Sequence, residues 1–169
     1  MYAGAWYGPL NDFLRGDVTA ESELETKDLY GYSAQEVAHD LLAPLDEAIS
    51  NSVLSTDTTV YRGMSSGAGA SEEEQQSFVK FIESLQPGTI FRDDAYLSTS
   101  SSKAVAARFA GSGPLSASFD LKLPAGFNGL KIAGSSEKEV LLSRGLSWEV
   151  RSVAEKDGTK IITLVPSGV

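Results

Sequence analysis

The feature that most limits the possible folds is the separation of helix signals from strand signals along the chain. The clearest helix signals lie in the first two thirds, at about residues 33–50, 71–85 and 102–110. The strongest strand signals lie in the last third, at residues 115–165. The regular alternation of strands and helices that a parallel sheet needs for its crossovers is missing from this pattern. We therefore predict an α+β fold rather than a doubly wound α/β sheet.

Two of the predicted helices begin with the same capping pattern. Ser33 and Glu36 form one capping box, and Ser71 and Glu74 form the other. Each box precedes apolar residues at helical spacing. Pro44 lies inside the first helix and should either kink it or restart it as a second helix.

One stretch in the last third alternates strictly between apolar and other residues, as a half-buried strand does. Its apolar positions are Leu115, Ala117, Phe119, Leu121 and Leu123. Asp157-Gly158 is a favourable hairpin turn between the last two predicted strands. The other predicted strands are shorter and lie at about residues 58–62, 89–91, 96–98, 129–132, 139–142, 147–153 and 160–165.

Length and composition indicate one domain spanning residues 1–169, with residues 1–30 as an irregular or short-helix lead-in. The net charge of −9 argues against a partner bound mainly through its phosphates, so no nucleic-acid partner is expected. No apolar run is long enough for a membrane span, and the first ten residues lack the pattern of a signal peptide. The chain has no cysteine and a single histidine, His39, which excludes disulfides, thiolate catalysis, and zinc-thiolate or multi-histidine metal sites.

Two glutamates near the C-terminus carry the strongest chemical signal. Glu137 and Glu139 flank Lys138, between a Gly-Ser-Ser turn and the apolar run at 140–142. In an extended backbone their side chains would project to the same side, roughly 7 Å apart. Such a carboxylate pair suits acid/base chemistry beside a developing positive charge. Taken alone, the pair is more simply explained as a solvated strand end.

Two other polar elements lie at predicted strand ends. Arg62 is followed by Gly63, which allows another part of the backbone to approach closely. The guanidinium of Arg62 could bind a phosphate or ribose oxygen. The serine-rich segment 98–102 leads into a helix start, where helix capping is the simple explanation. Capping does not explain why the hydroxyls begin inside the strand, at Ser98. The order arginine, Ser-Thr-Ser, Glu-x-Glu is much more specific than any one of these elements.

In these motifs the chain resembles the arginine-serine-glutamate class of mono-ADP-ribosyltransferases, which includes bacterial toxins, phage-encoded transferases and vertebrate ecto-transferases. The resemblance runs from about residue 29 to residue 150. Arg62 matches the arginine of the family's first strand, Ser98-Thr99-Ser100 matches its Ser-Thr-Ser strand, and Glu137-Lys138-Glu139 matches its Glu-x-Glu motif. The resemblance implies N-terminal helices packed on a two-sheet, mostly antiparallel β core.

The resemblance also implies roles for these residues. Glu139 would bind the ribose 2′-OH of NAD and stabilise an oxocarbenium-like transition state, and Ser98 would hold Glu139 in position by a hydrogen bond. Arg62 would anchor the NAD phosphates or the neighbouring ribose. Glu137 would orient and help deprotonate the acceptor. The residues implied to contact NAD are Arg62, Gly63, Ser98, Thr99, Ser100, Phe109, Tyr30, Tyr32 and Glu139.

The sequence departs from the family pattern at two places. Many toxin members have an aromatic residue a few positions before the first glutamate, in the turn that recognises the protein substrate. Gly134, Ser135 and Ser136 occupy that turn here. Some members have a second arginine after the phenylalanine, where this chain has Gly111-Ser112-Gly113 and only Arg108 nearby.

Glu-x-Glu accompanies arginine acceptors in this family, so the resemblance implies an NAD-dependent transferase that modifies a protein arginine and releases nicotinamide. As a toxin, effector or phage protein, it would be secreted or delivered into a host cell and act in the cytoplasm on a host protein. We expect a monomer, with an immunity or delivery protein as a further partner. Three alternatives stay open: a catalytically silent binding or virion module, an NAD glycohydrolase, and a transferase to a non-arginine acceptor.

Overall fold

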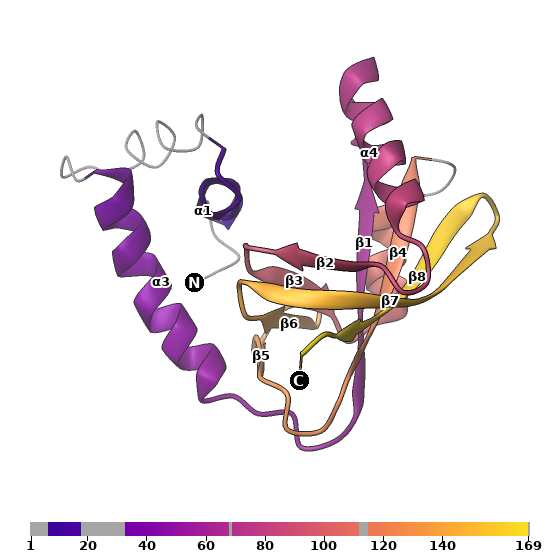
Figure 1. Cartoon of the computed structure of the whole chain (residues 1–169). Coiled ribbons are helices and arrows are strands. Elements are labelled where there is room, and N and C mark those ends of the chain that lie inside the picture. Colours follow the sequence, from indigo (N-terminus) through magenta and orange to yellow (C-terminus); the bar gives the residue numbers. More distant parts are fainter. Residues whose placement is uncertain (1–6, 18–32, 68, 112–114, 169) are drawn as a thin grey trace.

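The computed structural model describes residues 7–17, 33–67, 69–111 and 115–168 (Figure 1). The helices within these ranges are α1 (Tyr7–Leu14), α3 (Ala34–Ser50), α4 (Glu72–Ser84) and α5 (Lys103–Ala110). The strands are β1 (Thr58–Ser65), β2 (Ile90–Asp93), β3 (Leu97–Ser100), β4 (Ser116–Leu123), β5 (Gly129–Lys131), β6 (Glu139–Leu142), β7 (Leu146–Lys156) and β8 (Thr159–Pro166).

The two predicted capping boxes are confirmed. The Ser33 hydroxyl accepts a hydrogen bond from the backbone N–H of Glu36, whose carboxylate accepts one from the N–H of Ser33. Ser71 and Glu74 make the same reciprocal pair at the start of α4. α3 continues through Pro44 as one helix, so the predicted alternative of a restart is wrong. Proline removes one intrahelical donor, and tertiary packing of an apolar helix face readily outweighs that loss.

The eight strands form one sheet in the order β2-β7-β8-β4-β1-β3-β6-β5. Among the described strands, β4 and β8 are the one parallel pair and all other neighbours are antiparallel. The prediction of two sheets is therefore wrong, because hydrogen bonds between neighbouring strands join all the described strands into one sheet. β1 and β3 share a single residue pair, Tyr61 opposite Ser100, which joins the two parts of the sheet. Strand periodicity predicts which face is buried, but it does not specify pairing between residues far apart in the chain.

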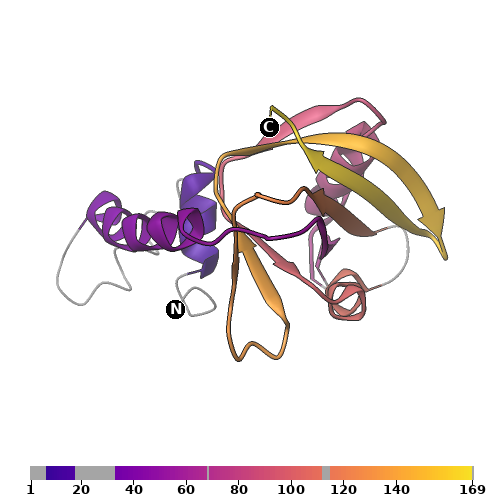
Figure 2. The same ribbon diagram turned by 90° about the horizontal axis from the view of Figure 1, so that it is seen from below.

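β7 and β8 form the long hairpin that Figure 2 shows curving across the molecule. The predicted turn at Asp157-Gly158 is confirmed, and both residues have positive φ, 53° and 76°. This conformation is that of a type I′ turn, whose twist matches the twist of the flanking strands. The register shifts between Val150 and Ser152, a bulge that bends the hairpin.

The predicted alternating strand is β4, and its alternation is confirmed. Ala117, Phe119, Leu121 and Leu123 are all buried. They belong to the main hydrophobic core, which also contains Val60 of β1 and buried residues of the β7–β8 hairpin. β4 lies between β1 and β8, so this core holds β1, with Arg62, in a central position of the sheet.

A second hydrophobic cluster joins α1 and α3 to the sheet. Its buried members are Leu10, Ala38, Ile49, Tyr96 and Leu141. Leu141 lies on β6, and Tyr96 directly precedes β3. The cluster therefore places the two N-terminal helices beside the strands that carry Ser98 and Glu139, as Figure 1 also shows.

A polar network reinforces this contact. Asp46 of α3 accepts hydrogen bonds from the Tyr96 hydroxyl (2.6 Å) and from Arg144 Nε and Nη2 (3.1 and 2.9 Å). Partial burial disfavours ionisation of Asp46, but the hydrogen bonds from Arg144 and Tyr96 outweigh it and lower the pKa of the carboxyl. Burial, followed by the hydrogen bond to Asp46, raises the pKa of the Tyr96 phenol.

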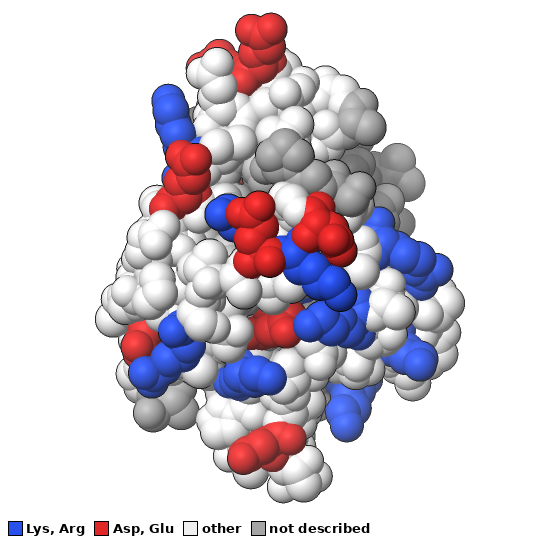
Figure 3. All heavy atoms as spheres, turned by 90° about the vertical axis from the view of Figure 1, so that its right-hand side faces the viewer, with Lys and Arg blue, Asp and Glu red and all other residues white. Residues whose placement is uncertain are grey.

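Charged side chains of both signs are interleaved over the face shown in Figure 3. Close ion pairs in the described chain include Lys160 with Glu155 at 2.7 Å and Lys103 with Asp120 at 3.0 Å. In the described part of the chain, no helix has the length and apolarity needed to cross a membrane.

Candidate active site

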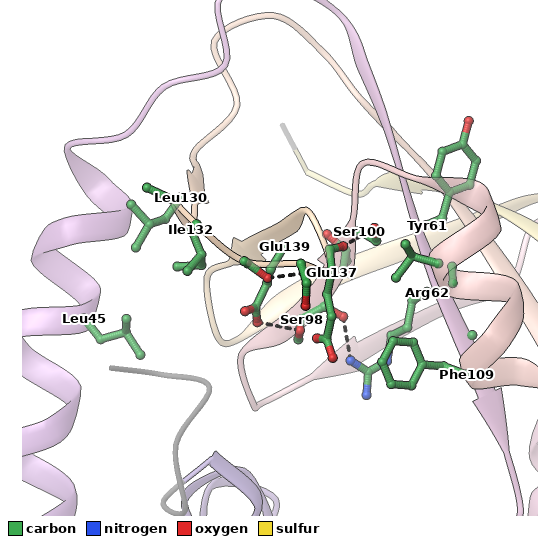
Figure 4. A pocket seen from close by; sticks show the side chains of 18 of the residues that line it. Leu45, Tyr61, Arg62, Ser98, Ser100, Phe109, Leu130, Ile132, Glu137 and Glu139 are labelled. Atoms are coloured by element: carbon green, nitrogen blue, oxygen red, sulfur yellow. Dashed lines mark hydrogen bonds between the residues drawn. The ribbon is translucent and has the colours of Figure 1, made fainter.

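A cleft of about 1070 Å³ opens between α3, β1, β3, α5 and the segment that leads into β6 (Figure 4). Its volume is slightly above the usual range of about 300–1,000 Å³ for small-molecule and cofactor sites. The predicted site residues that line it are Arg62, Gly63, Ser98, Thr99, Ser100, Phe109, Glu137 and Glu139. The fold thus brings all the described members of the predicted set together at one cleft. Tyr30 and Tyr32, also predicted to contact NAD, lie outside the described residues.

Glu139 is the buried carboxylate of the cleft, with 5% of its surface exposed. The Ser98 hydroxyl donates a hydrogen bond of 2.7 Å to its Oε1 atom. Ser100 pairs with Glu139 and Ser98 with Leu141 across β3 and β6, so Ser98 reaches Glu139 diagonally on the same face of the sheet. The contact implied by the resemblance is therefore present. It gives a buried carboxylate a fixed orientation.

Arg62 lies on β1 next to this pair. Its Nη1 donates a hydrogen bond of 2.7 Å to the backbone carbonyl of Ser98. Among the described residues that line the cleft, Arg62 is the one basic side chain. Because its position is held by β3, the guanidinium offers a fixed positive charge to an anionic group in the cleft.

Gly63 allows α5 to pack directly on β1. A Cβ atom at this position would collide with the backbone carbonyl oxygen of Ala106 and the backbone nitrogen of Ala110. The close approach that the sequence predicted at Gly63 is therefore an approach between a strand and a helix. It brings Phe109, near the end of α5, to the cleft with 57% of its surface exposed.

Glu137 lies on a turn rather than on the strand. β6 begins at Glu139, and Lys138 has a positive φ of 52°. The prediction of an extended backbone from Glu137 to Glu139 is therefore wrong, because a left-handed residue between them breaks the alternation of side chains. Both carboxylates nevertheless line the cleft, and Glu137 is exposed whereas Glu139 is buried (Figure 4).

The hydroxyls that follow Ser98 bind the backbone around the glutamates. Thr99 donates to the carbonyl of Val140, and Ser100 donates to the carbonyl of Glu137, both at 2.6 Å. Helix capping, the simple explanation for this serine-rich segment, is wrong. Within the described structure, the N-cap residue of α5, Ser102, makes no side-chain capping hydrogen bond.

One wall of the cleft was not predicted from the sequence as part of the site. It contains Asp40 and Leu45 of α3, Leu130 of β5, and Ile132. Figure 4 shows Leu45, Leu130 and Ile132 on the side opposite Arg62 and Phe109. The apolar stripe of α3 was visible in the sequence, but a stripe gives no sign of which part faces a cleft and which part faces the core.

Comparison with known proteins assigns this cleft to a family. The family model described as ADP-ribosyltransferase exoenzyme matches residues 1–165. The chain belongs to the ADP-ribosyltransferase exoenzyme family. It is therefore a toxin-type mono-ADP-ribosyltransferase that uses NAD as co-substrate. The comparison with curated protein sequences gave no match.

Solved structures share the fold at low sequence identity. The Vis toxin of Vibrio splendidus, an ADP-ribosyltransferase, is 22% identical with a TM-score of 0.69, over 99% of this chain and 70% of that one. A second ADP-ribosyltransferase, from Clostridium botulinum, is 16% identical with a TM-score of 0.66, over 95% and 80%. A C3-type protein of S. aureus, solved with NAD, is 22% identical with a TM-score of 0.62, over 94% and 84%.

Proposed function

We propose that this ADP-ribosyltransferase transfers ADP-ribose from NAD to an arginine side chain of a host protein. The observation that carries the proposal is the unequal placement of the two carboxylates in one cleft. Glu139 is buried and bonded to Ser98, whereas Glu137 is exposed on the preceding turn. A buried carboxylate suits a fixed charge at the reacting sugar, and an exposed one suits an incoming acceptor.

A structural relative supports the choice of arginine. The Vis transferase, which shares this fold, has been solved in complex with agmatine, at 21% identity. Agmatine is decarboxylated arginine and carries the same guanidinium group. A guanidinium pairs with a carboxylate through two parallel hydrogen bonds, and Glu137 offers such a carboxylate at the mouth of the cleft.

The proposed reaction breaks the bond between nicotinamide and C1 of its ribose. Nicotinamide leaves as a neutral molecule with the bonding electron pair, and positive charge develops at the sugar, as in glycoside cleavage. Glu139 stabilises this charge and binds the 2′-OH, while Ser98 holds Glu139 in place. Glu137 accepts a proton from the acceptor guanidinium, whose nitrogen then forms the new bond to C1.

The remaining site residues are proposed to bind NAD. Arg62 provides positive charge for a phosphate or ribose oxygen of NAD, and the exposed ring of Phe109 stacks on nicotinamide or adenine. Gly63, Thr99 and Ser100 line the same cleft. Tyr30 and Tyr32 complete the set as predictions, outside the described residues.

The biological setting follows from the toxin family. We propose that the chain, as one catalytic domain over residues 1–169, is secreted or delivered into a host cell and acts as a monomer in the cytoplasm. A host protein is then the substrate, and an immunity or delivery protein is a further partner.

The test distinguishes the roles of Glu137 and Glu139 by measuring nicotinamide release and transfer with purified protein, NAD and agmatine. Glu139→Gln should abolish both nicotinamide release and transfer to agmatine, since both need the charge at the sugar. Glu137→Gln should lower transfer by about a hundredfold or more, a typical loss for a general base, and leave part of the NAD hydrolysis. Glu83→Gln, an exposed glutamate of α4, is the matched control and should resemble the parent.

Two results would contradict the assignment. If the Glu139→Ala variant still consumed NAD at the parent rate, Glu139 would have no role in the reaction. Parent protein that releases nicotinamide without modifying agmatine would instead favour a glycohydrolase or a non-arginine acceptor. Mass spectrometry of a host lysate treated with the protein and labelled NAD would then identify the acceptor.

A further inference from the structure

Three consecutive residues at the end of β3 bind the backbone of the glutamate segment through their hydroxyls. Thr99 donates to the carbonyl of Val140 and Ser100 to that of Glu137, both at 2.6 Å. Ser101 donates to the carbonyl of Lys138, by its hydroxyl at 3.3 Å and by its backbone N–H at 3.0 Å. These side-chain bonds are additional to the ladder that pairs β3 with β6. They hold the start of β6 and the two residues that precede it.

The anchored carbonyls lie on both sides of a strained residue. Lys138 has a φ of 52°, which a residue with a Cβ atom adopts at a cost. The carbonyl of Glu137 precedes the φ bond of Lys138, and the carbonyl of Lys138 follows it. Fixing both groups therefore fixes the turn that takes Glu137 out of the strand and into the cleft.

Ser100 is the better placed of the two serines for this task. It is 5% exposed, and its hydroxyl also accepts a hydrogen bond of 3.0 Å from the N–H of Ser102. Two partners define its orientation, and the partly buried hydrogen bond to the carbonyl of Glu137 would be lost if Ser100 were truncated. Ser101 is exposed, and its backbone N–H would still bind Lys138 without the hydroxyl.

We propose that Ser100 is a positioning residue for the acceptor step, because it holds the backbone that carries Glu137. The proposal rests on the acceptor role proposed above for Glu137. It differs from the role of Ser98, whose hydroxyl bonds directly to Glu139 and therefore serves both NAD cleavage and transfer. Ser100 should affect transfer more than cleavage of NAD, because its hydroxyl bonds the backbone that carries Glu137 and not the carboxylate of Glu139.

The experiment compares two rates in each variant: nicotinamide release without acceptor, and transfer to agmatine. Ser100→Ala should lower the ratio of transfer to release about fivefold to tenfold, the effect of one lost hydrogen bond to a positioned group. Ser100 also lines the NAD cleft, so the nicotinamide release rate and the KM for NAD of the same variant serve as the reference against which the loss of transfer is measured. Ser101→Ala is the matched control and should keep the parent ratio.

A purely structural role of Ser100 would lower both rates together, and this result would overturn the proposal, as would an unchanged ratio in Ser100→Ala. If Ser100→Ala does not fold, Ser100→Thr and Ser100→Val provide a pair of equal shape. The threonine variant should keep the higher ratio because it retains the hydroxyl, and equal ratios would overturn the proposal. Glu137→Gln tests the underlying function separately, because it must lower the ratio whatever Ser100 does.

Discussion

The contact between Asp46 and Tyr96 should be a main polar anchor of α3. Asp46 lies on this helix, whereas Tyr96 and Arg144 belong to the part of the chain that carries β3 and β6. Tyr96 is fully buried, and its hydroxyl lies 2.6 Å from Asp46 and 3.4 Å from the carbonyl of Leu42. Replacing Asp46 by alanine therefore removes the short hydrogen bond of a buried phenol. We expect Asp46→Ala to destabilise the protein far more than Arg144→Ala.

The expected loss of stability in each variant follows from how exposed the side chains of Tyr96, Asp46 and Arg144 are. A hydrogen bond from a buried hydroxyl to a carboxylate contributes about 1.5–3 kcal/mol. Asp46 and Arg144 have side chains 39% and 41% exposed, and ion pairs at such exposure contribute only about 0–1 kcal/mol. Asp46→Ala should therefore lower the free energy of unfolding by about 2–3 kcal/mol, and Arg144→Ala by about 1 kcal/mol or less.

Equilibrium unfolding in urea measures both values, from the shift of the midpoint at an unchanged slope. Asp46→Asn keeps an acceptor for Tyr96 and should fall between the two alanine variants. Equal losses for Asp46→Ala and Arg144→Ala would refute the reasoning, because the surface ion pair would then account for the whole effect. A change in slope would indicate that the variant no longer unfolds in the same transition.

Two further predictions concern pH and packing. The pKa of Asp46 is lower in the folded state than in the unfolded state, so its ionised carboxylate stabilises the fold. This stabilisation is fully present above the unfolded-state pKa of about 3.9 and is lost as pH falls through the folded-state pKa. The stability difference between the parent and Asp46→Asn, measured in urea, should thus be constant near pH 6–7 and shrink below about pH 4; a difference that grows in acid would contradict this. Gly63→Ala should cost about 1–3 kcal/mol and raise the KM for NAD, because its Cβ would displace α5 and Phe109. Gly69→Ala, with no atom within 4 Å of its Cβ, is the control, and an equal effect there would exclude the packing explanation.

Local signals predicted the parts of this protein that form from neighbouring residues. The capping boxes at Ser33 and Ser71 and the turn at Asp157-Gly158 are all confirmed. The alternation of β4 was equally readable, because burial on one face of a strand follows directly from a period of two. The motif residues Arg62, Ser98 and Glu139 were also found from the sequence, although their assembly required a resemblance to a family.

The sequence did not predict how distant segments meet. It missed the single sheet and the β1–β3 junction, because strand partners are selected by contacts between residues far apart in the chain. It also placed Glu137 on an extended strand, since nothing in Lys138 itself favours a positive φ. Hydrogen bonds from Ser100 and Ser101 to the carbonyls of Glu137 and Lys138 supply the missing contacts.

Short-range patterns in the chain were thus enough to locate helices and strands, the faces they bury, and the polar residues that are chemically capable of the reaction. The folded sheet was needed to bury one carboxylate beside Ser98 and to expose the other on an anchored turn. The difference is one of range. Caps, turns and alternation act over a few residues, whereas the hydrogen bond between Ser98 and Glu139 spans 41 positions and exists only after the sheet has formed.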